Sequence, residues 1–238
     1  MPSNDLKKLK EEVKSLASPQ KAKILERFFK TGKGEYGEGD TFIGLQVPDA
    51  RKIVRKYADI SLDDTLQLLK SEIHEERLIA LLVMVEKTRQ ADESGKEILF
   101  KKYLENTRYI NNWDLVDLSA DKIVGSYLFE KPKDILYLLA VSENLWERRI
   151  AILATFDFIK KGFYEDALRI VKTVLNDRHD LIHKAAGWML RETGKRCSQE
   201  VLEQFLLANY RKMPRTMLRY AIERLPEPLR LQYLNGEK

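Results

Sequence analysis

The segment Asn111–Asp117 places two unusual neighbours near the middle of the chain, the indole of Trp113 and the carboxylate of Asp117. Residues four apart lie on the same face of a helix, so a helix here brings the two groups together. An indole face attracts cations, and a carboxylate can stabilise positive charge or orient a water molecule. The pair predicts a site for a cationic group. The alternative is structural, with Trp113 in the core and Asp114 or Asp117 capping or decorating a helix.

Positive charge collects in the C-terminal part of the chain. Residues 145–238 carry 18 Lys+Arg and 12 Asp+Glu, a net charge of +6, whereas the first 144 residues carry 24 basic and 25 acidic side chains, a net charge of −1. In the basic part Trp188 lies between Lys184 and Arg191. This distribution favours a polyanionic partner, with nucleic acid the first choice.

Composition excludes several other classes of protein. With 44% hydrophobic and 33% charged residues, the chain is typical of a folded protein with a core. Its single cysteine, Cys197, excludes an intramolecular disulfide and a four-cysteine zinc site. His179 and His183 lack the glutamate of the HExxH zinc motif, so we expect no metal. No apolar run is long enough to span a membrane, and the first residues lack the hydrophobic core of a signal peptide. We therefore expect a cytoplasmic, nucleoid-associated protein with no membrane partner.

Helices are the elements that must position these groups. Apolar residues recur at helical spacing along the chain, Ser61 and Asp92 are suited to cap helix starts, and no segment has the pattern of a strand. The long non-helical stretch, residues 32–48, holds five of the 11 glycines but lacks the Gly-Lys-Ser/Thr of a phosphate-binding loop. We expect one helix from Trp113 to about Gly125, and a last helix, Pro214–Leu225, followed by a short tail.

An internal repeat orders the helices into pairs. The second helix of each pair has an alanine at an equivalent position, and these alanines are 71, 35 and 35 residues apart: Ala80, Ala151, Ala186 and Ala221. The missing repeat falls at about residue 115, within the Asn111–Asp117 segment. A two-helix repeat of this length without the TPR pattern favours HEAT-like units. The predicted fold class is all-α, a right-handed α-solenoid of HEAT-like helical pairs with a concave basic surface, in a single domain over residues 1–238.

In a solenoid the second helices line one surface, usually the concave one. The starts of the second helices then form a row in which three of five positions are basic: Arg148 with Arg149, Lys184 beside Trp188, and Arg215 with Arg219. Evenly spaced cations suit the periodic charges of a duplex backbone. The alternative is that these cations belong to ordinary solvated helix faces.

An aspartate in a basic trough needs a positive partner, because it would otherwise repel DNA. A cationic nucleobase meets this need, and so does the positive charge that develops on a deoxyribose as its base departs. Trp113, Trp188 and Asp117 together are suited to stabilise an oxocarbenium-like transition state, and the carboxylate can also orient or deprotonate the attacking water.

Four separated motifs resemble those of one family. They cover nearly the whole chain in the right order: Gly37–Asp40 with Phe42, Gly44, Pro48 and Arg51; Asn112–Asp117; Glu143–Leu153; and Lys184–Glu192. The chain resembles the bacterial DNA alkylation repair enzymes of the AlkD type. The resemblance implies a HEAT-like helical fold and a monofunctional DNA glycosylase that works without metal or cofactor. Such an enzyme removes cationic alkylated purines, 3-alkyladenine and 7-alkylguanine, from duplex DNA. We expect a monomer.

The resemblance also implies roles for residues. By motif position, Trp113, Asp117 and Trp188 hold the sugar and backbone of the lesion, Asp117 is the catalytic carboxylate, and the base need not enter a pocket. Arg149 matches the arginine that binds the DNA backbone near the lesion. Phe28 stands where related enzymes can have tyrosine, a departure that removes a hydroxyl contact but keeps an aromatic surface. The predicted catalytic residues are Asp117, Trp113, Trp188 and Arg149. The predicted DNA-binding residues are Arg148, Lys184, Arg191, Phe28, Arg215 and Arg219.

Two other functions fit parts of the same sequence. One is a non-catalytic HEAT-repeat protein that binds branched or distorted DNA, since some members of the wider family lack the aspartate or the tryptophans, all of which this chain has. The other is a helical-repeat scaffold for a peptide or protein, which predicts a hydrophobic groove around Trp113. Release of 3-methyladenine and 7-methylguanine from methylated duplex DNA distinguishes the enzyme from both.

Overall fold

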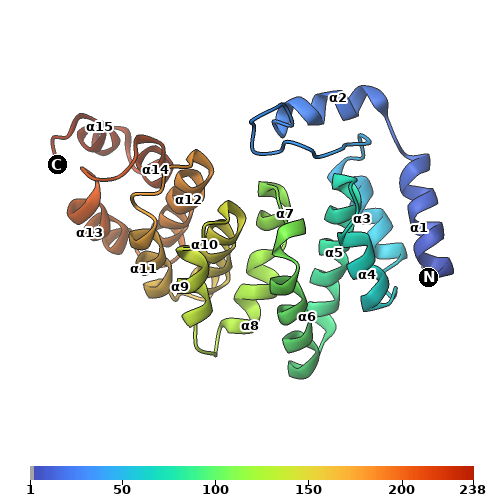
Figure 1. Cartoon of the computed structure of the whole chain (residues 1–238). Coiled ribbons are helices and arrows are strands. Elements are labelled where there is room, and N and C mark those ends of the chain that lie inside the picture. Colours follow the sequence, from blue (N-terminus) through green and yellow to red (C-terminus); the bar gives the residue numbers. More distant parts are fainter. Residues whose placement is uncertain (1–2) are drawn as a thin grey trace. The chain divides into compact units, whose positions relative to one another are not determined.

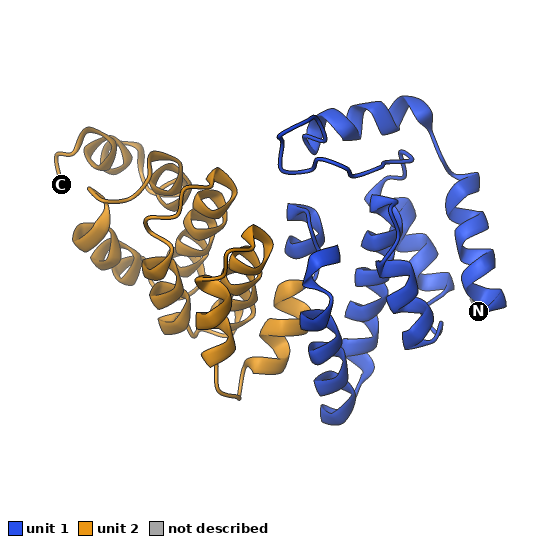
Figure 2. Cartoon of the chain, viewed as in Figure 1, with its two compact units in different colours: residues 1–119 blue, residues 120–238 orange. Residues whose placement is uncertain are grey.

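The structure is a computed structural model that describes residues 3–238, and over that range it is all-helical, as the sequence predicts (Figure 1). The chain forms two compact units, of which the first ends at Ser119 and the second spans Ala120–Lys238 (Figure 2). Among the described residues, strand-like pairing is limited to an isolated bridge between Thr41 and Ile73. No described helix combines the length and apolar character needed to cross a membrane.

In the first unit, helix α5 is the central element. It is enclosed because α3, α4, α6 and α7 all pack against it, and its residues from His74 to Met84 are buried. A helix that is buried on all sides forms the core of its unit. The helices of this unit are α1 (Asn4–Ser15), α2 (Pro19–Phe28), α3 (Val47–Lys56), α4 (Leu62–Leu69), α5 (His74–Gln90), α6 (Glu93–Glu105) and α7 (Trp113–Asp117), with a 3₁₀ turn at Thr107–Tyr109.

Predicted capping residues begin several of these helices. Ser61 Oγ accepts a hydrogen bond from the Asp64 amide at the start of α4, and Asp92 Oδ1 accepts one from the Gly95 amide at the start of α6. Each cap satisfies an amide that has no partner within the helix. These two predicted helix starts are confirmed.

The second unit repeats one packing arrangement. Its helices α10, α12 and α14 pack in succession, while α9 packs on α10 and both α11 and α13 pack on α12, as in an α-solenoid. The repeated alanines Ala151, Ala186 and Ala221 are buried. The elements are a π-helix (Asp121–Gly125), α8 (Ser126–Leu128), α9 (Asp134–Ala140), α10 (Leu145–Lys160), α11 (Glu165–Thr173), α12 (Asp180–Arg196), α13 (Gln199–Asn209), α14 (Arg215–Ala221) and α15 (Glu227–Asn235).

The prediction of one continuous helix from Trp113 to Gly125 is wrong. Helix α7 ends at Asp117, a turn follows, and residues Asp121–Gly125 form a π-helix. The hydroxyl of Ser119 donates to the Leu115 carbonyl at 2.5 Å, a side-chain bond that competes with the helical ladder and often bends a helix. The Trp113–Asp117 pair therefore lies on a single short turn of helix.

The prediction of a short tail after Pro226 is also wrong, because residues Glu227–Asn235 form α15. Pro228 lies in its first turn, where the missing amide hydrogen costs nothing. Gly236 ends it in the left-handed conformation at φ 77°, which glycine adopts without strain. Tyr233 is buried, so the helix is part of the fold.

Gly187 allows α12 and α14 to approach closely. A Cβ atom at this position would lie 2.5 Å from the Met217 carbonyl oxygen and 2.6 Å from Tyr220 Cβ, so backbone must move to admit it. We predict that Gly187→Ala lowers the free energy of unfolding by about 1–3 kcal/mol, measured by urea denaturation. Gly194→Ala on the same helix is the control, because its Cβ meets mainly the flexible end of Leu202. Equal stability of the two variants would contradict a close contact at Gly187.

Candidate functional site

Helix α7 carries Trp113 and Asp117 and is too short to be stable by itself. Five residues make little more than one turn, and isolated helices of this length do not persist in water. Asn112 caps the helix, because its Oδ1 accepts a hydrogen bond from the Trp113 amide at 2.8 Å. The same side chain donates from Nδ2 to Asp40 Oδ2 at 3.1 Å. Asn112 thereby connects the start of α7 to residues 32–46, the glycine-rich loop that precedes α3.

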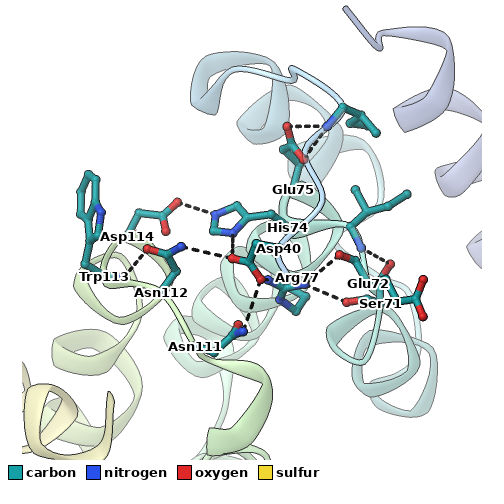
Figure 3. Close-up of polar contacts among 12 residues, drawn as sticks. Asp40, Ser71, Glu72, His74, Glu75, Arg77, Asn111, Asn112, Trp113 and Asp114 are labelled. Carbon is teal, nitrogen blue, oxygen red and sulfur yellow. Dashed lines mark hydrogen bonds and ion pairs between the residues drawn. The ribbon is translucent and has the colours of Figure 1, made fainter. Parts of the chain in front are cut away.

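A buried histidine extends this connection (Figure 3). His74 Nδ1 lies 3.0 Å from Asp40 Oδ2, and its Nε2 lies 2.9 Å from Asp114 Oδ2. Arg77 donates to Asp40 Oδ1 at 2.5 Å, and Asn111 donates to the same oxygen at 3.3 Å. The imidazole therefore bridges two carboxylates that come from the loop and from α7.

The electrostatics of this cluster favour a charged histidine. Burial by itself lowers the pKa of His74, but the charge of Asp114 and the hydrogen bonds to Asp114 and Asp40 outweigh it and raise the pKa from 6.5 to about 9. For Asp40, burial raises the pKa, yet the hydrogen bond from His74 and the charge of Arg77 lower it below its ordinary value. At neutral pH both ring nitrogens of His74 donate, and two cations face two carboxylates in the interior.

The glycine-rich loop is fixed to the first turn of α5. The carboxylate of Glu75 accepts hydrogen bonds from the amides of Ile43, Gly44 and Leu45, and the His74 amide donates to the Thr41 carbonyl at 2.9 Å. Gly44 has φ 87°, and a Cβ atom there would lie 2.2 Å from the Ser18 carbonyl oxygen, so only glycine fits. The loop is an ordered part of the first unit.

Aromatic rings pack around Trp113. Its indole stacks on Phe29 with centroids 5.1 Å apart, and Phe28 meets it edge-on at 5.6 Å. Phe42 stacks on Phe29 and on His74. Trp113 is half-buried against this core cluster, whereas Phe28 is 59% exposed. The alternative in which Trp113 belongs to the core is therefore partly correct, because one side of the indole packs on the core cluster. The indole also lines a pocket.

That pocket has a volume of about 470 Å³ and lies within the first unit. Its walls are mostly apolar and come from α2, α3, α5, α7 and the loop before α3. The ionisable residues of the lining are His74, Glu75, Asp114 and Asp117. Trp113 and Asp117 thus line one pocket. An aromatic wall beside carboxylates is suited to hold a flat, positively charged group. Among residues 3–238 no cluster of His, Cys, Asp and Glu is suited to hold a metal ion.

In the second unit, Lys184, Trp188 and Arg191 follow one another along one side of α12. Trp188 is partly exposed and packs against Phe156 on α10, with centroids 5.6 Å apart. Lys184 pairs with Asp180 at 2.7 Å, and Arg191 pairs with Glu223 on the segment after α14. The tryptophan is therefore flanked by cations that already have carboxylate partners.

The remaining predicted cations differ in exposure. Arg149 is only 4% exposed and donates to the Leu181 carbonyl at 2.5 Å, and Arg148 pairs with Asp177 at 2.6 Å. Arg215 and Arg219 are exposed on α14, and Arg215 also donates to the Leu234 carbonyl. In this structure Arg149 faces the interior of its unit. Its predicted contact with DNA requires the buried side chain to reach the surface.

Sequence reasoning missed the residues that hold α7 in place. From the sequence, His74 has no predicted role, Asp40 is only part of a motif, and Asp114 is a possible cap. One signal was present: a histidine and three further ionisable residues, Glu75, Glu76 and Arg77, stand directly before a run of eight apolar residues, 78–85. Buried ionisable residues require partners.

Comparison with known proteins identifies the fold and then the family. The structure is similar to that of a "Predicted DNA alkylation repair enzyme from Enterococcus faecalis", with 16% identity, a TM-score of 0.70, and coverage of 89% of this chain and 97% of that chain. The comparison with curated proteins gave no match. The profile of a family described as DNA alkylation repair enzyme matches residues 9–225. The chain therefore belongs to the DNA alkylation repair enzyme family, which suggests a role in repairing alkylation damage and implies DNA as a partner.

The charged state of His74 predicts how stability depends on pH. Because its pKa is raised in the folded protein, its stabilising contribution is complete below about pH 6.5 and is lost as the pH rises through about 9. The loss is on the order of 3 kcal/mol in the free energy of unfolding. We expect urea denaturation at pH 6.5 and pH 9.5 to show this decline for the wild type.

Two variants test the assignment of that decline to His74. His74→Gln should be less stable at pH 6.5 and should lack most of the decline. His179→Gln is the control, because burial lowers the pKa of His179 and its loss should leave the decline in place. A decline of wild-type size in His74→Gln would contradict the charged state of His74.

Proposed function

We propose that this protein is a monofunctional DNA glycosylase that hydrolyses the N-glycosidic bond of cationic N3- and N7-alkylated purines in duplex DNA, as the first step of base excision repair. The observation that carries the proposal is that Asp117 and Trp113 line one aromatic-walled pocket in a chain of the DNA alkylation repair enzyme family. The motif resemblance, which assigns these two residues to the lesion, supports the same conclusion.

The chemistry needs little beyond position and charge. An alkylated purine that is already cationic leaves as a neutral base and takes the electron pair of the C1′–N bond. Positive charge then develops on the deoxyribose, where the Asp117 carboxylate stabilises it and orients water to attack C1′. The oxygen of the water forms the new bond to C1′, and its proton passes to the carboxylate or to solvent. The indole of Trp113 contributes about 0.5–2 kcal/mol of cation–π attraction.

DNA binding falls mainly to the second unit, whose helices carry the excess positive charge. Trp188 contacts the lesion nucleotide as the second tryptophan, and the cations predicted around it bind the phosphate backbone. The residues in this role are Arg148, Arg149, Lys184, Arg191, Arg215 and Arg219. Arg148, Lys184 and Arg191 do so by exchanging their carboxylate partners for phosphate. In the first unit, exposed Phe28 offers an aromatic surface to the DNA. The protein acts as a monomer and without a cofactor.

A peptide-binding scaffold remains the alternative that one observation favours. The pocket beside Trp113 has mostly apolar walls, as such a scaffold predicts. Asp117 in the lining favours a cationic ligand instead. A non-catalytic binder of branched or distorted DNA is a separate outcome, which the excision assay identifies by duplex binding without release of bases.

Loss of the Asp117 charge is predicted to stop most of the excision. With methylated duplex DNA, we expect the wild type to release 3-methyladenine and 7-methylguanine faster than they are lost spontaneously. Asp117→Asn should excise about 100-fold more slowly, because charge stabilisation at the reacting centre is lost. The measurement is the single-turnover rate of base release, resolved by chromatography.

The matched control is Asp63→Asn, which removes an exposed carboxylate from the first turn of α4. It should release bases at the wild-type rate. If the wild-type protein releases no base above the spontaneous rate, the glycosylase proposal is wrong. Asp117→Asn with wild-type activity would remove Asp117 from the catalytic role only.

The basic residues predict binding that depends on salt. The affinity for an undamaged duplex should fall steeply as the salt concentration rises, and Arg219→Ala should reduce the slope of log affinity against log salt by about 1. Fluorescence anisotropy at several salt concentrations gives the slope. Lys101→Ala on α6 is the control and should leave the slope unchanged. Affinity that does not respond to salt would argue against phosphate contacts.

A further inference from the structure

We propose that Asp40 and His74 are positioning residues of the glycosylase, which hold the first turn of α7 and so determine where Trp113 and Asp117 lie. The proposal deepens the proposed function and rests on it for the reaction, but its structural part can be tested without any activity. Neither residue is assigned a contact with DNA. Both act through their hydrogen bonds to α7.

The two residues hold the chain on both sides of Trp113. Asn112 precedes the tryptophan and donates to Asp40 Oδ2 at 3.1 Å. Asp114 follows it and receives the His74 Nε2 hydrogen bond at 2.9 Å. Because the residues immediately before and after Trp113 are both fixed, the direction of the Trp113 side chain is fixed as well.

The same contacts reach Asp117 through the backbone of α7. Asp114 and Asp117 are three positions apart on one turn, and the Leu118 amide donates to the Asp114 carbonyl at 3.0 Å, which closes that turn. A five-residue helix has few hydrogen bonds of its own, so outside contacts decide its orientation. A shift at Asp114 is therefore transmitted to the Asp117 carboxylate.

These hydrogen bonds lie in the interior of the first unit, where charged groups must keep good hydrogen-bond geometry. His74 is 1% exposed, and Asn112, Asp114 and Asp40 are also buried. Charge-assisted hydrogen bonds in a low-dielectric interior are strong and directional, and a buried charge that loses its partner is costly. The cluster tolerates only arrangements in which each carboxylate keeps a donor. One arrangement of α7 is selected in this way.

The cluster is itself held by elements outside α7. Arg77 on α5 donates both to Asp40 and to the Ser71 and Glu72 carbonyls. The His74 amide donates to the Thr41 carbonyl. The glycine-rich loop thus serves the site through Asp40, which connects the core helix α5 to α7.

The first variant for the test is Asp40→Asn, which preserves the shape of the side chain and removes its charge. Protein labelled with 5-fluorotryptophan gives one fluorine NMR signal for each of Trp113, Trp146 and Trp188, and Trp113→Phe identifies the first. We expect Asp40→Asn to shift or broaden the Trp113 signal. We also expect the single-turnover excision rate to fall at least about 10-fold, while the dissociation constant for DNA stays within about twofold.

A second variant and a matched control separate positioning from lost stability. His74→Gln retains one hydrogen bond and should also change the Trp113 signal and lower the excision rate. This variant provides the test if Asp40→Asn does not fold. Asp157→Asn in the second unit is the control. Asp157 and Asp40 are both 9% exposed, and Asp157 pairs with Lys160 and Lys161. Its variant should keep the wild-type Trp113 signal and excision rate.

The outcomes distinguish the two proposals. An unchanged Trp113 signal in the folded variants would overturn the positioning role, and so would a shifted signal with an unchanged excision rate. An equal loss of excision in Asp157→Asn would also overturn it, since a general loss of stability would then explain the result. A wild type that excises no base defeats the proposed function alone, and the Trp113 signal then decides whether Asp40 and His74 position α7.

Discussion

The hydrogen-bonded ion cluster in which His74 bridges Asp40 and Asp114 is the interaction on which the arrangement of the first unit depends. It joins a loop, the first turn of the core helix α5 and the short helix α7. Charges are rarely buried unless they are paired, and here the Arg77 guanidinium and the protonated imidazole balance the two carboxylates. Without this balance, α7 has too few contacts of its own to keep one orientation.

The proposed chemistry explains why such a fixed arrangement is useful. A cationic purine needs no acid to leave, so the protein has to supply a charge at the right place and little else. A carboxylate that is already in position does not have to reorganise as positive charge develops on the sugar. The aromatic stack of Phe42, Phe29 and Trp113 supports the same geometry from the apolar side. The buried ion cluster and the aromatic stack thus act on one helix.

Much of the fold was predictable from local patterns, but the support of the site was not. Helical periodicity, caps such as Ser61 and the 35-residue repeat predicted the helices and their packing in pairs. Those patterns depend on near neighbours, whereas His74 meets partners 34 and 40 residues away. The Ser119 hydroxyl that interrupts the helix after Asp117, and the use of Pro228 to begin rather than prevent a helix, also depend on context. The sequence indicates Trp113 and Asp117 as candidate site residues but not the residues that hold them.

The central claim is that Asp117 stabilises positive charge on the sugar of the lesion. The most direct test compares two duplexes, one with a cationic pyrrolidine that has nitrogen in place of C1′ and one with a neutral tetrahydrofuran abasic site. We predict that the wild type binds the cationic duplex about 100-fold more tightly, as expected for a transition-state mimic, and that Asp117→Asn loses most of this preference. Equal affinity of the wild type for both duplexes, or an undiminished preference in Asp117→Asn, would contradict the claim.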